Sequence, residues 1–211
     1  MSKLNPVLWN TVILGNWNPA ILTPKGIAKH IFDLPDETPF EVLVPVNAMG
    51  QPKVKINGFL VSADFDKLVI DCEKHDWDSL EKSRDYCIGA MNSLPVTPVS
   101  AAGFNIRYEM EDPSEDFMEL LRPQLDARIS DNHLKMVARQ IRRSIAWNDG
   151  NINLHMTRQE GENYRILLNF HKKSNDRNVI EKWLSTPIEE ARKIAQTLIC
   201  SILELCEEGE I

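Results

Sequence analysis

Cys72 and His75 are the residues in this chain that come nearest to a metal-ligand pair. They form a C-x-x-H spacing at the end of an apolar run. A structural zinc site needs four ligands, and the sequence contains neither a second pair at suitable spacing nor an H-E-x-x-H motif. We therefore expect no metal, with Cys72 in the core and His75 in the loop before a helix.

Other catalytic groups are not indicated by the residue spacing. No serine sits on a glycine-flanked strand-to-helix turn, no cysteine and histidine have the arrangement of a catalytic pair, and the phosphate-binding glycine loops are absent. One acidic stretch differs in spacing from a calcium loop, so we interpret it as a solvated face. It contains Asp64, Asp66, Asp71, Glu73, Asp76, Asp78, Glu81 and Asp85. The sequence predicts no catalytic residue and no cofactor, and leaves open a site assembled from distant residues.

A set of basic residues in the second half departs from the acidic average of the chain. The set is Arg139, Arg142, Arg143, Arg158, Arg165, Lys172, Lys173 and Arg177. If these cations share one sheet face with Trp147 and Tyr164, they form a platform for nucleic acid. Their alternation with apolar residues equally indicates the solvent side of a half-buried sheet, which is the interpretation we favour.

An N-terminal loop carries a tryptophan among turn-forming residues, in the order Gly15, Asn16, Trp17, Asn18, Pro19. Trp17 either anchors this loop in the core or is an exposed contact for a protein partner, since tryptophan is enriched at such contacts. Asn16, Trp17 and Asn18 are therefore our candidates for partner binding.

Two helices are predicted by apolar residues at steps of three and four. One starts near Asp76 and ends before Pro95. The other extends from Ile188 to Leu205, after a T-P-I-E sequence at Thr186 that is typical of a capping box. A third segment, Leu134–Ile141, steps like a helix but continues as an alternating strand, and we expect helix first and strand after it.

Runs rich in β-branched and aromatic residues predict hairpins before each of these two helices. They are Lys53 to Val61 with Lys67 to Cys72, and Asn151 to Arg158 with Tyr164 to His171. Upstream of each pair lie an early strand, a proline-started helix and a further strand: Thr11–Leu14, Pro24–Phe32 and Phe40–Asn47, then Phe104–Met110, Pro113–Leu121 and Ile141–Asn148.

This element order predicts an α+β fold that is a tandem pseudo-repeat of β-α-β-β-β-α units. We expect a mostly antiparallel sheet with amphipathic helices packed on one face. The halves are 1–98 and 99–211, sharing one body. The order resembles, in topology alone, the saddle of TATA-box-binding proteins, and no functional residue is transferred from that resemblance.

Composition narrows the class of protein. The chain has 211 residues and a net charge of −7, which argues against non-specific binding to nucleic acid or acidic membranes. No apolar run reaches the roughly 20 residues of a membrane span. The start MSKLNPVLWN lacks the pattern of a secretory signal, and four cysteines favour buried free thiols, so we expect a cytoplasmic protein.

Three functions remain. We expect a non-catalytic interaction or assembly subunit that binds a protein partner, or another copy of itself, through a sheet face or edge. The first alternative is nucleic-acid binding by the arginine-bearing sheet of the second half. The second is an enzyme with a site between the halves, where Asn16, Asn18, Asn105, Arg107 and Tyr108 would converge. The absence of catalytic motifs favours the interaction subunit.

Overall fold

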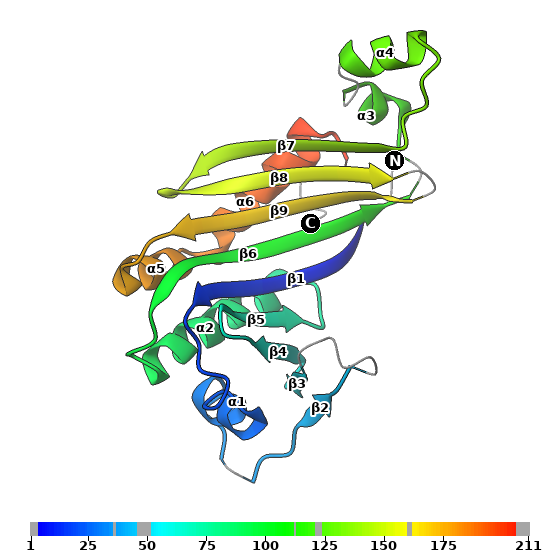
Figure 1. Ribbon diagram of the computed structural model, residues 1–211. Helices are drawn as coiled ribbons and strands as arrows, with labels where there is room; N and C mark the ends of the chain where they lie inside the picture. Colours follow the sequence, from blue (N-terminus) through cyan, green and yellow to red (C-terminus); the bar gives the residue numbers. More distant parts are fainter. Residues whose placement is uncertain are drawn as a thin grey trace.

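The computed structural model describes residues 4–35, 37–45, 52–111, 113–120, 124–159 and 162–205. Its strands form one antiparallel sheet in which β1 and β6 lie at the centre and pair with each other (Figure 1). In sheet order the strands are β2 (Glu41–Leu43), β3 (Lys53–Ile56), β4 (Phe59–Ala63), β5 (Lys67–Cys72), β1 (Leu4–Gly15), β6 (Val99–Met110), β9 (Tyr164–Lys173), β8 (Gly150–Gln159) and β7 (Ala138–Trp147).

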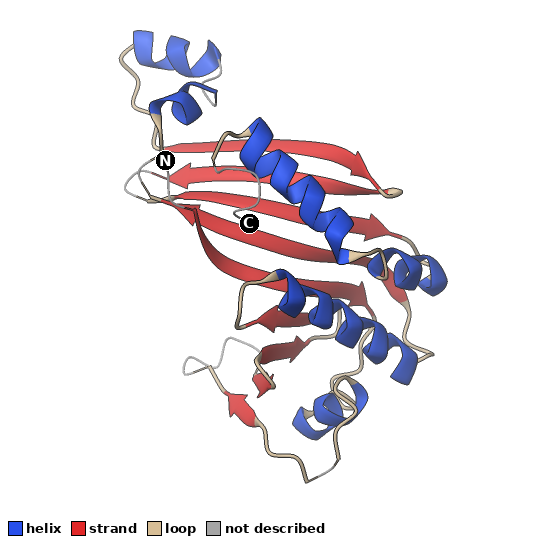
Figure 2. Ribbon diagram, turned by 180° about the vertical axis from the view of Figure 1, so that it is seen from behind, coloured by secondary structure: helices blue, strands red, loops and turns tan. Residues whose placement is uncertain are grey.

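Helices α2, α5 and α6 cover one face of this sheet, and the other face carries no helix from the described part of the chain (Figures 1 and 2). The helices are α1 (Pro24–His30), α2 (Trp77–Ser93), α3 (Glu115–Leu120), α4 (Gln124–Asp131), α5 (Arg177–Leu184) and α6 (Ile188–Gln196), which continues as a π-helical turn, η1 (Thr197–Ile202). The expected α+β class, with an antiparallel sheet, is confirmed. We call the uncovered side the open face.

The apolar core lies between the sheet and the helices. Alternate residues of β1, β3, β4, β5, β6, β8 and β9 point into it and form one continuous cluster of buried side chains. Partly buried residues of β7 pack against this cluster. Beneath α5, Phe104 and Phe170 stack with ring centroids 4.4 Å apart, and Trp147 and Trp183 contact them edge-on or tilted. This aromatic group fixes the second half of the sheet against α5.

Arg84 of α2 joins this helix to the C-terminal end of α5. It is 3% exposed, its Nε donates to the Leu184 carbonyl at 2.8 Å, and its Nη2 donates to the carbonyls of Leu184 and Thr186. The last carbonyls of a helix lack partners within it, so a buried cation satisfies both the hydrogen bonds and the helix dipole of α5. Burial lowers the pKa of Arg84 below its usual value.

The helix starts agree only in part with their sequence signals. Thr23 and Asp76 cap α1 and α2 as N-cap side chains. The capping box predicted at Thr186 is not formed: Pro187 is the N-cap of α6 and makes no side-chain cap. The reason is that the Thr186 backbone belongs to the preceding turn, where its N–H donates to Trp183 and its carbonyl accepts from Arg84.

Three other predictions need correction. The run Lys53 to Val61 is two strands, divided by a turn at Asn57 and Gly58, whose φ angles are +50° and +83°. No helix forms at Leu134, because α4 ends at Asp131 with His133 in the left-handed region (φ +58°) and β7 starts at Ala138. Helices α4 and α5 were not predicted. The end of the predicted strand Phe40–Asn47, at residues 46 and 47, lies outside the described residues.

The cysteines agree only in part with the expectation of buried free thiols. Cys72 and Cys87 are free and buried as expected, whereas Cys200 is disulfide-bonded, so the free-thiol prediction is wrong for Cys200. Cys206 lies outside the described residues.

Among the helices that the structure describes, none has both the length and the apolar character to cross a membrane.

Candidate functional site: a polar ladder on the open face

The open face has a row of polar side chains at its centre, one on each of several neighbouring strands. Four asparagines occupy strand positions between core residues: Asn10, Asn105, Asn153 and Asn169. Asparagine is depleted in strands, so four of them at central positions require an explanation. The register supplies it, because Asn10 lies opposite Asn105, Asn105 opposite Asn169, and Asn169 opposite Asn153.

These side chains form a continuous hydrogen-bonded ladder, which we call the asparagine ladder. Adjacent strands are about 4.8 Å apart, so each amide reaches its neighbour. The bonds, donor first, are Ser144 Oγ to Asn153 Oδ1 (2.9 Å), Asn153 Nδ2 to Asn169 Oδ1 (2.9 Å), Asn169 Nδ2 to Asn105 Oδ1 (2.9 Å), Asn105 Nδ2 to Asn10 Oδ1 (2.7 Å) and Asn10 Nδ2 to Asp71 Oδ1 (2.9 Å). The ladder thus extends from β7 to β5 and crosses the central β1–β6 pair.

The donor-to-acceptor direction of the asparagine ladder is set by Asp71 at one end. An ionised carboxylate only accepts hydrogen bonds, so Asn10 must turn its NH₂ group toward Asp71 and its carbonyl toward Asn105. The same constraint passes from one amide to the next, until Ser144 must donate its hydroxyl hydrogen. At the end, Lys53 Nζ donates to the second Asp71 oxygen at 2.7 Å. Asp71 is 6% exposed, so this pairing compensates a buried charge.

Cations outnumber carboxylates on the open face, although the whole chain has a charge of −7. By strand alternation the cations are Lys53, Lys55, Lys67, Arg107, Arg142, Arg165 and Lys173, and the carboxylates are Glu41, Asp71 and Glu109, with Glu73 at the end of β5. Lys53, Lys55 and Arg165 are paired with Asp71, Glu73 and Glu109. The open face is therefore locally basic and rich in hydrogen-bonding groups.

The chain matches no protein-family model and no curated protein. Its function is therefore inferred from the geometry of this face.

The basic residues proposed for nucleic-acid binding divide between the two sides of the sheet. Arg142, Arg165 and Lys173 lie on the open face, whereas Arg139, Arg143, Arg158 and Lys172 have the opposite strand phase. On that opposite side, Arg139 pairs with Asp126 at 2.5 Å and Arg158 lies over the Tyr164 ring.

The aromatic partners proposed for a stacking platform lie on the helix side. Trp147 packs edge-on against Phe170, and Tyr164 is 2% exposed. The condition that the cations share one face with Trp147 and Tyr164 is not met, because the aromatic rings complete the core. No phenylalanine, tyrosine or tryptophan side chain of the described strands points to the open face.

His155 is a titratable group beside the asparagine ladder. It lies opposite Arg142 on β7 and opposite Leu167 on β9. Burial, and then the nearby positive charge of Arg142, lower the pKa of His155 below its usual value. The imidazole is therefore mainly neutral at pH 7 and adds a further hydrogen-bonding group to the open face.

The loop candidates lie away from the asparagine ladder. Trp17 is 2% exposed and its Nε1 donates to the Ile13 carbonyl at 3.2 Å, so this side chain anchors the loop and is not an exposed contact. Asn16 and Asn18 are exposed. Asn16 lines a hollow of about 420 Å³ at the end of β1, with Asp66 and Asn175.

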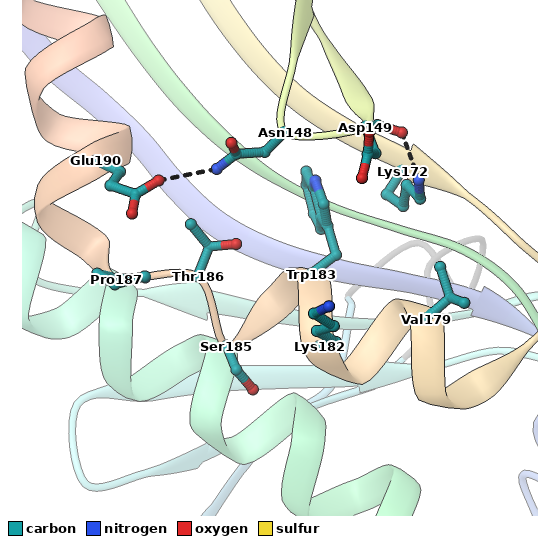
Figure 3. A pocket seen from close by; sticks show the side chains of 10 residues that line it. All are labelled: Asn148, Asp149, Lys172, Val179, Lys182, Trp183, Ser185, Thr186, Pro187 and Glu190. Atoms are coloured by element: carbon teal, nitrogen blue, oxygen red, sulfur yellow. Dashed lines mark hydrogen bonds between the residues drawn. The ribbon is translucent and has the colours of Figure 1, made fainter.

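A larger hollow of about 600 Å³ lies where the β7–β8 turn meets the α5–α6 junction (Figure 3). Asn148 Nδ2 donates to Glu190 Oε2 at 3.0 Å, and Lys172 donates to the Asp149 carbonyl. Two pairs of the residues that line this hollow thus bond to each other. Its walls contain no paired nucleophile and base, so it gives no basis for a reaction.

Metal and thiol chemistry have no support in the described residues. They contain no group of three or more histidine, cysteine and acidic side chains placed to hold a metal ion. Burial raises the pKa of Cys72 to about 12, and burial also raises the pKa of Cys87. Both thiols are therefore protonated and unreactive at neutral pH.

Proposed function

We propose that this protein is a non-catalytic interaction subunit that binds an acidic, polar surface of a protein partner through the open face of its sheet. The observation that carries the proposal is the asparagine ladder on a locally basic, uncovered face. Half-buried amides that bond in a row still offer their second N–H and second lone pair outward. Such groups suit a polar partner, and the surrounding cations suit an acidic one.

Nucleic-acid binding is the second candidate, because Arg107, Arg142 and Lys173 share the open face and have no carboxylate partner among the described residues. A protein partner has more support. Single strands are held largely by stacking on aromatic rings, and the rings of these strands point to the helix side. Half of the cations first considered for a nucleic-acid interface also point to the helix side of the sheet. The resemblance in element order to TATA-box-binding proteins remains a prediction.

An enzyme site between the halves has less support. Asn105 and Arg107 lie on the open face, Tyr108 is buried on the helix side, and Asn16 and Asn18 lie in the loop after β1. These residues do not converge on one cleft. Catalysis would also require a nucleophile activated by a base, whereas in the asparagine ladder the Ser144 hydroxyl donates to Asn153 and Asp71 is paired with Lys53.

The proposal includes the duplicated architecture. Each half starts with a central strand, β1 or β6, that pairs with the last strand of its own meander, β5 or β9. The tight turns β3–β4 and β7–β8 both have two residues of positive φ. These agreements support halves 1–98 and 99–211, with β3 rather than Phe40–Asn47 equivalent to β7.

A cytoplasmic location is supported by free Cys72 and Cys87, whereas the disulfide at Cys200 counts against it.

Charge reversal on the open face tests the proposal. Arg107→Glu combined with Arg142→Glu changes two cations beside the asparagine ladder that have no carboxylate partner among the described residues. The matched control, Arg128→Glu with Lys193→Glu, makes the same charge change on exposed positions of α4 and α6. The probes are a fluorescein-labelled poly-glutamate peptide and a single-stranded DNA of equal charge, followed by anisotropy at two salt concentrations.

We expect the wild type and the control to bind the peptide, and the open-face variant to bind it about tenfold or more weakly. DNA should bind more weakly than the peptide. Equal loss in the control, or no peptide binding by the wild type, overturns the proposal. Tighter binding of DNA that depends on Arg107 and Arg142 replaces it with the nucleic-acid function.

A further inference from the structure

The strand β7 forms an edge of the sheet. Over its ten residues it pairs with β8 on one side, and no described strand pairs with its other side. At its start, Arg139 is joined to Asp126 of α4. From Gln140 onward the outer edge is an exposed row of backbone groups in regular register, with none of the bulges that natural sheets use to block such edges.

The turn after β7 determines which of these backbone groups point outward. Asn148 and Asp149 have φ angles of +44° and +55°, which is a two-residue type I′ turn. In such a hairpin the flanking residues, Trp147 and Gly150, exchange hydrogen bonds, and every second residue of β7 then turns its N–H and C=O away from β8. The outward set is Ala138, Gln140, Arg142, Ser144 and Ala146.

One hydrogen bond agrees with this assignment of the outward-pointing backbone groups of β7. The Arg142 carbonyl, which belongs to the outward set, accepts from Arg143 Nη1 at 2.8 Å. A side chain thus occupies a backbone position that a neighbouring strand would use. An incoming strand would take over this carbonyl and release the Arg143 guanidinium to bind a carboxylate.

The side chains along the β7 edge determine which residue types an incoming strand needs. On the open face, Arg142 faces outward beside Ser144, whose hydroxyl donates to Asn153 and therefore has free lone pairs. On the helix side, Arg143 lies between Ile141 and Ile145, which are only partly buried. A matching strand has a hydrogen-bond donor opposite Ser144, carboxylates opposite the two arginines and apolar residues opposite the isoleucines.

We propose that β7 binds an extended acidic segment of a partner protein as an additional antiparallel strand, with an asparagine opposite Ser144 extending the asparagine ladder. This inference deepens the proposed function and rests on it for the kind of partner. Backbone pairing supplies affinity in this mode, and alternate side chains supply specificity. A second copy of the chain is a poorer occupant, because antiparallel pairing of two β7 edges brings their arginines together.

The test uses the full chain and the fluorescein-labelled peptide Thr-Val-Asn-Glu-Glu-Val-Thr, which aligns its asparagine with Ser144. In the antiparallel pairing, the N–H groups of the asparagine and of the second glutamate face β7. N-methylation at these two positions removes the backbone bonds and retains every side chain. The matched control carries two N-methyl groups on the first glutamate and the second valine, whose N–H groups point away.

We expect the first methylated peptide to bind at least about tenfold more weakly than the parent, and the control to stay close to the parent. Hydrogen exchange at the amides of Arg142 and Ser144 should slow on binding. Arg142→Glu with Arg143→Glu should lose the parent peptide and gain one with lysines in place of both glutamates. Circular dichroism verifies the fold of this variant.

Equal weakening by both methylation patterns, or no binding of the parent peptide, overturns the strand inference. If poly-glutamate still binds through Arg107 in that case, only the role of the edge is lost. If the parent peptide binds at the edge while poly-glutamate binding is insensitive to the open face, the edge stands and the proposed face interaction falls.

Discussion

Removing Asn105 should destabilise the fold by more than the loss of one ordinary surface side chain. Asn105 occupies the centre of the asparagine ladder, where it accepts from Asn169 and donates to Asn10. In Asn105→Ala both partners lose a bond. Asn10 is 6% exposed and cannot readily recover one from water, whereas Asn169 is only partly buried and can.

The magnitude follows from these two environments. An unsatisfied buried polar group costs about 1–3 kcal/mol, and a lost bond that water replaces costs about 0.5–1 kcal/mol. We therefore expect Asn105→Ala to lower the free energy of unfolding by about 2 kcal/mol. In a chain of this size that corresponds to a fall in Tm of about 4–8 °C.

The matched control is Asn151→Ala, on the same face of β8 but outside the asparagine ladder. Asn151 is exposed, and its replacement should change stability by less than about 0.5 kcal/mol. Urea denaturation followed by tryptophan fluorescence measures both variants. If Asn105→Ala and Asn151→Ala lie within 0.5 kcal/mol of each other, the bonds contribute little to stability and the reasoning fails.

Three further outcomes are expected. Arg84→Met should lower the free energy of unfolding by about 2–4 kcal/mol in urea denaturation, because the carbonyls of Leu184 and Thr186 lose their charged donor; a loss below about 1 kcal/mol contradicts this role. Cys72 should resist iodoacetamide at pH 8 until urea unfolds the protein, since burial raises its pKa to about 12, and rapid labelling of the native protein, read by mass spectrometry, argues against it. Arg142→Ala should raise the NMR-titrated pKa of His155 only part of the way to its usual value, because burial is the larger cause of the lowering; an unchanged pKa shows that the two side chains do not interact.

The sign of the His155 effect also predicts a pH dependence. A histidine with a lowered pKa in the folded state takes up its proton more readily after unfolding. Its contribution therefore favours the folded state above the unfolded pKa of about 6.5 and declines as the pH falls through that value. His155→Gln should flatten this part of the stability curve between about pH 7 and pH 5.

The helices and strands with strong periodicity were predictable from local sequence. Helix α2 has an aspartate cap and a proline after its end, and β8 and β9 alternate between buried and more exposed residues. Helix α5 was not predicted because its eight residues give only two turns of signal. The capping box failed at Thr186 for a tertiary reason, the contact with Arg84, which local spacing does not contain.

The asparagine ladder was predictable only as a set of unexplained residues. Each of its asparagines stands between large core residues, as in Phe104-Asn105-Ile106 and Leu168-Asn169-Phe170. That pattern identifies a polar side chain on the face opposite the core. It does not predict that β1 lies beside β6 and β6 beside β9, and the row exists only in this strand order.

A single carboxylate sets the direction of the whole asparagine ladder. Replacing Asp71 by asparagine removes the constraint, because an amide both donates and accepts hydrogen bonds. In the present direction of the ladder, this amide accepts from Asn10 only by turning its own NH₂ toward the Lys53 ammonium, so Lys53 then faces another donor. Lys53→Met should relieve that conflict, so Asp71→Asn with Lys53→Met should be more stable than the sum of the single changes implies. Lys53 is 43% exposed and screened by solvent. Strict additivity in this double-mutant cycle would mean that Lys53 turns to solvent or that the asparagine ladder reverses with Ser144 as an acceptor, and it would refute a fixed ladder direction.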